Sequence, residues 1–260
     1  MADPDDRGKR HRQRKLFDSV AELYDSTRSG YPGEIVAAMV ATSGVRAGSR
    51  VLEVGCGTGQ LTRDLATYGF ELTAIDLGAA MVGAARRHVP GQAVAFQVSS
   101  YEDFEAPDHT FDLVASATAF HWIDPEVAWA KAVRLLVPGG WLAVLSTGEH
   151  YDDPLGAALM DIWVRHGDDG GAWTRAAPPT VAESMSRTGL FGTPVVRLHT
   201  ERRSIPAERV LGLEQTRATS LSYDTQTRES FRDELAALLG SSVDVGMAQE
   251  TSLTMGQSVA

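Results

Sequence analysis

Cysteine is almost absent from this sequence, because Cys56 is the single one in 260 residues. An internal disulfide and a zinc site built from several cysteines are therefore excluded, and so few cysteines are typical of a reducing compartment. Long apolar runs are missing as well. None approaches the roughly 18 residues that a membrane helix needs, and the polar amino terminus has no apolar stretch behind it. We expect a cytoplasmic protein without membrane contact.

Positive charge is also scarce, with 24 lysines and arginines against 34 aspartates and glutamates and a net charge of −10. Phosphate binding depends on basic side chains, so a surface that embraces nucleic acid is disfavoured. Residues 1–15 are the exception, because they combine a basic run with a few aspartates. Such a pattern is typical of a disordered basic leader, with an RNA-binding arm as the alternative.

The chain is long enough to bury a full core, and 43% of it is hydrophobic. Apolar residues at helical spacing over residues 16–24 and 35–40 predict two helices, the second ended by Gly44. We assign residues 16–48 to an N-terminal lid of helices.

Strands and helices then alternate over residues 49–146. Short apolar runs predict strands at residues 50–54, 70–76, 93–98, 111–116 and 141–146. Helices are expected between several of them, including one over residues 125–136 that Asp124 caps. Strands separated by helices favour a parallel sheet covered on both faces.

The alternation of strands and helices ends after residue 146. Residues 147–193 mix glycine, aspartate, proline and tryptophan around one helical stretch at 155–164, which predicts a cap inserted for substrate. Residues 194–260 are expected to complete the sheet, with a strand at 195–200, lid helices at 206–221 and 225–239, and a last strand from 243.

A glycine turn follows the first predicted strand. Gly55, Gly57 and Gly59 precede a helix that begins near Gln60, so backbone can approach a ligand closely at a helix amino terminus. A dinucleotide fingerprint needs its third glycine three residues after the second, where Gln60 stands. This spacing argues against a nicotinamide-dependent dehydrogenase.

With Glu53 on the strand before it, the turn resembles the first motif of class I S-adenosylmethionine-dependent methyltransferases. The resemblance continues through Ala-Ile-Asp-Leu at 74–77, Ser-Ser-Tyr-Glu-Asp at 99–103, Phe-Asp-Leu-Val at 111–114 and Leu-Leu-Val-Pro-Gly-Gly-Trp at 135–141. Phe-His-Trp-Ile-Asp-Pro at 120–125 looks most like the type 11 enzymes grouped with trans-aconitate methyltransferase.

The resemblance implies an α/β fold of the Rossmann-like class I methyltransferase type. In it, a mostly parallel seven-stranded sheet has helices on both faces, an N-terminal helical lid and a cap insertion. The implied cofactor is S-adenosyl-L-methionine, with S-adenosyl-L-homocysteine as product. The implied reaction moves a methyl group to a small-molecule acceptor by in-line displacement, with oxygen the preferred acceptor atom and carbon or nitrogen left open.

Cofactor contacts follow from the matched motifs. They are implied for Tyr24, Arg28, Glu53, Gly55, Cys56, Gly57, Gly59, Asp76, Leu77, Met81, Ser100, Tyr101, Glu102 and Ala117. Asp76 would accept hydrogen bonds from the ribose hydroxyls, Glu53 would bind the ammonium group, and Arg28 would pair with the carboxylate. Ser100 departs from the pattern, since many relatives carry aspartate there.

The acceptor side rests on His121, which follows the fourth predicted strand. A neutral histidine there would take a proton from the acceptor, or it would only form part of the pocket wall. Further acceptor contacts are expected from Tyr31, His121, Trp122, Trp163, Trp173 and Arg217.

Other readings stay open. Histidines and aspartates at residues 150–153 and 166–169 resemble solvated turns, so no metal site is expected. The basic leader motivates an RNA or protein acceptor, and a non-catalytic S-adenosylmethionine-binding protein would bind cofactor without turnover. A monomer and a homodimer fit the sequence equally well.

Overall fold

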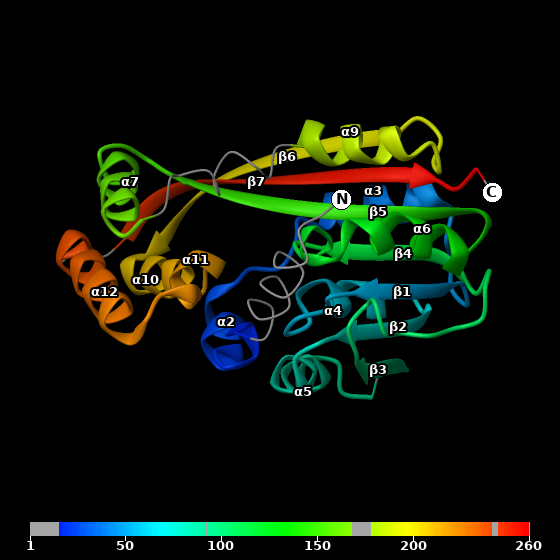
Figure 1. Ribbon diagram of the computed structural model, residues 1–260, viewed down its shortest axis with the longest axis horizontal. Helices are drawn as coiled ribbons and strands as arrows, with labels where there is room; N and C mark the ends of the chain where they lie inside the picture. The colour runs from blue at the N-terminus through cyan, green and yellow to red at the C-terminus, as the bar shows by residue number, and fades with distance from the viewer. Residues whose placement is uncertain (1–15, 92, 168–177, 241–243, 260) are drawn as a thin grey trace.

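The computed structural model describes residues 16–91, 93–167, 178–240 and 244–259, and over these residues seven strands form one sheet (Figure 1). The strands are β1 (Arg50–Val54), β2 (Glu71–Asp76), β3 (Val94–Val98), β4 (Phe111–Ala117), β5 (Leu136–Tyr151), β6 (Val195–Pro206) and β7 (Asp244–Gln257). Their order is β3-β2-β1-β4-β5-β7-β6, with β1 to β5 parallel and β7 antiparallel to both its neighbours. The predicted mostly parallel sheet is confirmed.

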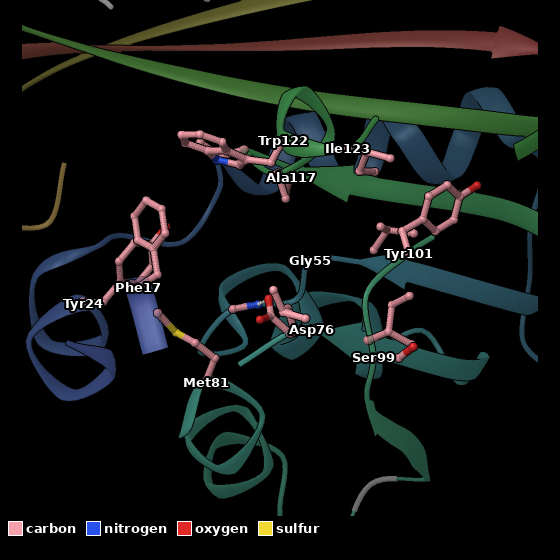
Figure 2. A pocket seen from close by; sticks show the side chains of 16 residues that line it. Phe17, Tyr24, Gly55, Asp76, Met81, Ser99, Tyr101, Ala117, Trp122 and Ile123 are labelled. Atoms are coloured by element: carbon pink, nitrogen blue, oxygen red, sulfur yellow. Dashed lines mark hydrogen bonds between the residues drawn. The ribbon is translucent and has the colours of Figure 1, made fainter. Parts of the chain in front are cut away.

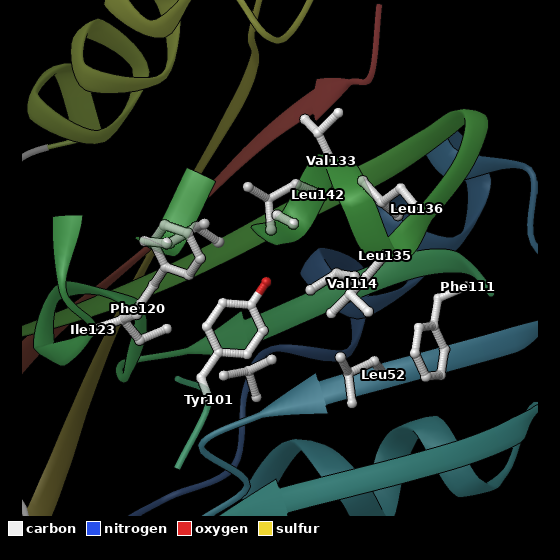
Figure 3. Packing of buried hydrophobic residues seen from close by; sticks show 14 of the residues in the cluster. Leu52, Tyr101, Phe111, Val114, Phe120, Ile123, Val133, Leu135, Leu136 and Leu142 are labelled. Carbon is white, nitrogen blue, oxygen red and sulfur yellow. The ribbon is translucent and has the colours of Figure 1, made fainter. Parts of the chain in front are cut away.

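Helices cover both faces of this sheet. They are α2 (Ala21–Thr27), α3 (Gly33–Ser43), α4 (Gln60–Ala66), α5 (Ala79–His88), the short 3₁₀ helix η1 (Phe120–Trp122), α6 (Pro125–Leu135), α7 (Leu155–Arg165), α9 (Pro178–Thr188), α10 (Ala207–Gln215), α11 (Ala218–Ser222) and α12 (Thr225–Leu239). Val51 packs toward α3 and α4, whereas Leu52 and Val54 pack toward α6 and α9 (Figure 3). Burial on both faces explains why Val51, Leu52 and Val54 of β1 are all apolar although they point to different sides of the sheet.

Local signals set the helix ends. The Asp124 side chain accepts a hydrogen bond from the Glu126 amide at 3.0 Å, and Pro125 fills the first helical position of α6. Gly44 ends α3 in a left-handed conformation at φ 69°. These caps supply backbone partners that helix termini otherwise lack.

Two strands run further than the sequence predicted, β5 with 16 residues and β6 with 12. Together with the 14-residue β7 they continue past the carboxyl end of β4, so β5 crosses the expected boundary at residue 146 (Figure 1). At their far end they carry α7, α10, α11 and α12 around a second hydrophobic cluster that contains Trp163 and Phe231. We call residues 147–165, 200–239 and 244–251 the arm. Helix α9, which the sequence did not predict, packs beside β6 and β7 instead.

Helix α2 of the predicted lid lies between the core and the arm, where it contacts α5 and α10 (Figure 1). Asp18, just before it, accepts hydrogen bonds from the amides of Ala80 and Met81 at the start of α5. Asp25 on α2 accepts from the ring of His88 at the end of α5, at 2.8 Å. On the other side, Gly212 of α10 leaves room for the Thr27 side chain. Hydrogen bonds to α5 and packing against α10 therefore hold the lid in place on both sides.

Candidate functional site

A pocket opens at the carboxyl ends of β1, β2 and β4, beneath the N-terminal segment (Figure 2). It holds about 700 Å³ of space between atoms, part of it open to solvent. Its lining comprises Phe17, Tyr24, Val54, Gly55, Gly57, Ile75, Asp76, Leu77, Met81, Ser99, Tyr101, Ala117, Thr118, Ala119, Trp122 and Ile123. The strand order reverses between β1 and β4, the point where open α/β sheets bind ligands.

The three glycines of the turn have different tasks. All have positive φ: 72° at Gly55, 54° at Gly57 and 92° at Gly59. A Cβ on Gly55 would overlap Ala119 in the turn after β4, and one on Gly59 would lie 3.1 Å from the Ala85 Cα of α5. A Cβ on Gly57 would approach only the Gln60 Oε1, at 3.8 Å. Gly55 and Gly59 therefore serve packing, while Gly57 leaves backbone exposed to the pocket.

Asp76 fixes the turn from the tip of β2. Its Oδ2 accepts from the Gly57 amide at 2.9 Å, and its Oδ1 accepts from the Gly78 amide at 2.8 Å. Asp76 also lines the pocket, so its carboxylate both holds the glycine turn and faces the space that a ligand would fill.

Glu53 lies behind the turn and does not line the pocket. The side chain is 1% exposed, and its Oε2 has no hydrogen-bond partner. Burial raises the pKa of Glu53 to about 8, because removal from water disfavours the charged carboxylate. A buried acceptor of this kind is suited to a cationic or hydrogen-bond-donating ligand group.

Eight of the residues implied as cofactor contacts line the pocket: Tyr24, Gly55, Gly57, Asp76, Leu77, Met81, Tyr101 and Ala117. Figure 2 shows Tyr24 on the side of the N-terminal segment, Met81 reaching in from α5, and Tyr101 on the opposite side. The sequence did not point to Phe17, Ser99, Thr118, Ala119 or Ile123, which line it too. Their position next to predicted residues was the available signal.

The remaining implied contacts point elsewhere. Cys56 packs among Ala74, Val82 and Ala85 under α5, where burial raises the pKa of its thiol. Two more are engaged next to the pocket: the Ser100 hydroxyl donates to Asp103 Oδ2 at 2.6 Å, and Glu102 Oε1 accepts from the Asp124 amide at 3.2 Å. Ser99 takes the pocket position instead.

His121 and Trp122 follow β4 in η1. The ring of Trp122 lines the pocket and meets Phe17 edge-on at 6.0 Å. His121 lies 4.9 Å from the Trp122 ring and keeps an exposed side chain beside the pocket. Neighbouring protein atoms take some water from the imidazole and lower the pKa of His121 below its ordinary value. The imidazole is therefore mostly neutral near pH 7.

Tyr31 reaches the pocket rim from the loop between α2 and α3. Its hydroxyl lies 3.0 Å from the Thr118 hydroxyl. Thr118 has φ 56°, a strained conformation for a β-branched residue, and it lines the pocket. The Tyr31 contact thus supports a strained turn that borders the site.

The other predicted contacts belong to the lid and the arm. Arg28, which was implied as the partner of the cofactor carboxylate, does not line the pocket, and its Nη1 lies 3.4 Å from Glu149 Oε1 on β5. Trp163 is buried in the arm, and the Arg217 guanidinium lies over its ring at 5.5 Å. Trp173 lies outside the described residues.

Comparisons with known proteins agree with this geometry. Residues 52–144 match the family model of a methyltransferase domain. The chain is 34% identical over 129 residues to an uncharacterized methyltransferase of Mycobacterium tuberculosis. The aligned stretch covers 50% of this chain and 51% of that protein. It is 33% identical over 183 residues to the malonyl-[acyl-carrier protein] O-methyltransferase of Hahella chejuensis, and this alignment covers 68% of this chain and 62% of that protein. A structure described as a type II methyltransferase from Anaeromyxobacter dehalogenans superposes with a TM-score of 0.63 at 22% sequence identity. The superposition covers 88% of this chain and 97% of that one.

Residues 52–144 carry a methyltransferase domain, and the chain has the fold of the class I S-adenosylmethionine-dependent methyltransferases. This confirms the resemblance that the motifs indicated, while the closer likeness to trans-aconitate methyltransferase stays a prediction. The chain spans about half the length of the Mycobacterium relative, with 51% of that protein covered. The likeness to the Anaeromyxobacter structure, at 22% identity, concerns the fold.

The pocket of this chain fits S-adenosylmethionine. Gly57 leaves room for backbone contact with a ligand, and Asp76 presents a carboxylate suited to hydroxyl groups. Behind the glycine turn, outside the pocket lining, Glu53 Oε2 is a buried acceptor without a partner. A ribose supplies the hydroxyls, and an amino acid supplies the ammonium group. Among the described residues, no set of three histidine, cysteine, aspartate or glutamate side chains is placed to hold a metal ion. Likewise, no described helix is long and apolar enough to cross a membrane.

Proposed function

We propose that this chain transfers the methyl group of S-adenosylmethionine to a small-molecule acceptor, with oxygen as the first acceptor atom to test. The main support is the pocket at the point where the strand order reverses between β1 and β4, which Phe17 and Tyr24 of the N-terminal segment border. The name of the Hahella relative, an O-methyltransferase, supports oxygen.

In this proposal S-adenosylmethionine supplies a methyl group that its sulfonium already activates. Asp76 and the backbone at Gly57 hold the nucleoside end. Phe17, Tyr24 and Trp122 cover the pocket and exclude water. Positioning an acceptor in line with the methyl group then provides most of the acceleration.

Proton transfer has a small part in the proposal. His121 is the candidate base, yet its lowered pKa makes it a weaker proton acceptor than a free imidazole. Burial raises the pKa of both Tyr24 and Tyr31, so neither phenol ionises readily. We therefore propose that His121 orients the acceptor more than it deprotonates it.

The test uses methyl-labelled S-adenosylmethionine and a cell extract. After incubation, small metabolites are separated from RNA and protein, and label is counted in each fraction. Label in small molecules is expected. Label in RNA or protein would contradict the small-molecule acceptor, and bound cofactor without label in any fraction would favour the non-catalytic reading.

A further inference from the structure

A cluster of charged side chains lies where the lid meets the arm. Its members come from the end of α2, from β5 and β6, from α10 and from the residue that precedes α11. They are Arg28, Glu149, Arg203, Arg209, Glu214 and Arg217, and we call them the junction cluster. Its two carboxylates are almost fully buried, with Glu149 5% and Glu214 0% exposed.

The two carboxylates are bound by two of the arginines. Arg217 donates from Nε and Nη2 to both oxygens of Glu214, at 2.8 and 3.0 Å, and from Nη2 to Glu149 Oε2 at 3.4 Å. Arg28 donates to Glu149 Oε1 at 3.4 Å. The other two guanidinium groups, on Arg203 and Arg209, share the Ser29 hydroxyl as an acceptor.

Positive charge exceeds negative charge in this cluster. Four guanidinium groups stand against two carboxylates, which leaves an excess of two positive charges. Burial alone would raise the pKa of Glu149, but Arg28, Arg217 and Arg203 outweigh it and hold that pKa below the ordinary carboxyl value. Charge withdrawn from water is costly unless an opposite charge meets it.

Two buried N–H donors in the same region have no partner. Trp163, whose ring lies under Arg217, is 1% exposed, and its Nε1 makes no hydrogen bond. The Arg203 Nε is likewise buried without an acceptor. Buried donors are normally satisfied, so two in one charged region point to a ligand that brings acceptor atoms.

The cluster is continuous with the cofactor pocket. The Arg28 guanidinium lies over the ring of Tyr24, 5.4 Å from its centre, and Tyr24 lines the pocket. Arg28 uses three of its five N–H groups, toward Glu149, Thr216 Oγ1 and the Leu213 carbonyl. The side chains of Arg28 and Arg217 stay 16% and 17% exposed, so a ligand can reach both.

We propose that the methyl acceptor carries an anionic group, a carboxylate or a phosphate, that binds at the junction cluster between Arg28 and Arg217. The inference rests on the proposed function, since it names the class of acceptor for that same site. Glu149 and Glu214 act as positioning residues that hold the two guanidinium groups toward the anion. The acceptor atom then lies on the pocket side, beyond Tyr24.

The experiment titrates the purified full chain by calorimetry, first with S-adenosylhomocysteine. Malonate, glutarate and inorganic phosphate are then titrated into the protein saturated with S-adenosylhomocysteine. We expect at least one anion to bind, and the comparison of carboxylates with phosphate identifies the group. Failure to bind S-adenosylhomocysteine would overturn the proposed function, whereas its binding without any anion binding would overturn this inference alone.

Variants that remove a positive charge and a variant that removes a negative charge should have opposite effects, which makes the test specific. Arg28→Gln and Arg217→Gln should each weaken binding of the anion roughly tenfold or more, because a charge-assisted hydrogen bond is lost. Glu149→Gln removes a negative charge and should tighten it. Arg232→Gln on the exposed face of α12 is the matched control and should change nothing. A cluster with only a structural role would shift the three junction variants in one direction, which would contradict the proposal.

Discussion

The two ends of the site are built in different ways. At the cofactor end, most pocket residues sit at the carboxyl ends of strands β1 to β4 or in the segments that follow them, and only Phe17 and Tyr24 come from the lid. At the proposed acceptor end, the arginines and the glutamate come from segments up to 189 positions apart. Arg28 lies on the lid, Glu149 and Arg203 lie on long strands, and Arg217 immediately precedes α11. The first end depends on local backbone geometry, and the second depends on how the lid and the arm are fastened together.

The largest expected effect concerns the glycine turn. Gly55→Ala should destabilise the free protein by about 2–4 kcal/mol, because left-handed strain adds to overlap with Ala119. Gly57→Ala carries similar strain without that overlap, so it should cost about 1–2 kcal/mol. Urea unfolding measures both free energies. Equal losses would show that packing against Ala119 is unimportant, and Ala119→Gly should restore part of the loss in the Gly55 variant.

The charge of Asp76 sharpens the comparison at the cofactor end. Asp76→Asn keeps an acceptor for the Gly57 or Gly78 amide but removes the charge, so affinity for S-adenosylhomocysteine should fall about 10–100-fold. Calorimetric titration gives the dissociation constant. Asp161→Asn, on the exposed surface of α7, is the control. An unchanged constant for the Asp76 variant would remove the ribose assignment.

Glu53 predicts a pH dependence of cofactor binding. Its pKa of about 8 means that the carboxyl group is mostly protonated at pH 7 in the free protein. A bound ammonium group favours the ionised form, so binding should release a proton and affinity should rise between pH 6 and 8. Calorimetry in buffers of different ionisation enthalpy counts the proton. Proton release that persists in Glu53→Gln would place the titrating group elsewhere.

The smallest expected effect lies at the boundary between the two ends. Tyr31→Phe removes the contact with the strained Thr118 and should cost about 1 kcal/mol in thermal unfolding. Tyr68→Phe, whose ring stacks on Phe70, serves as the control. A double-mutant cycle with Thr118→Ala isolates the pair, and a coupling energy of zero would show that the two hydroxyls do not support each other.

The cofactor end was largely predictable because its signals are local. A buried strand, a glycine turn and an acidic tip occupy residues 50–76, where spacing alone fixes their relation. The prediction was less accurate at turns. Ser100 was implied as the pocket residue, but Ser99 lines the pocket and the Ser100 hydroxyl donates to Asp103. Sequence spacing could not tell which of two adjacent serines faces a ligand.

The arm was harder to predict because its strands lack the usual apolar pattern. Residues 146–150 of β5 are polar or glycine, which is typical of a loop, yet they pair with β7 from Ser146 to Tyr151. Their stability comes from antiparallel pairing with a segment about 100 residues later in the sequence. The contact of Arg28 with Glu149, in place of the implied cofactor carboxylate, follows from the same distant pairing.

The most direct test of the account titrates S-adenosylhomocysteine into the unaltered chain, Asp76→Asn and Arg217→Gln. The account predicts tight binding to the unaltered chain, weaker binding to the Asp76 variant, and an unchanged dissociation constant for the Arg217 variant. An Arg217 variant that loses cofactor affinity as strongly as the Asp76 variant would contradict the division into a cofactor end and an acceptor end.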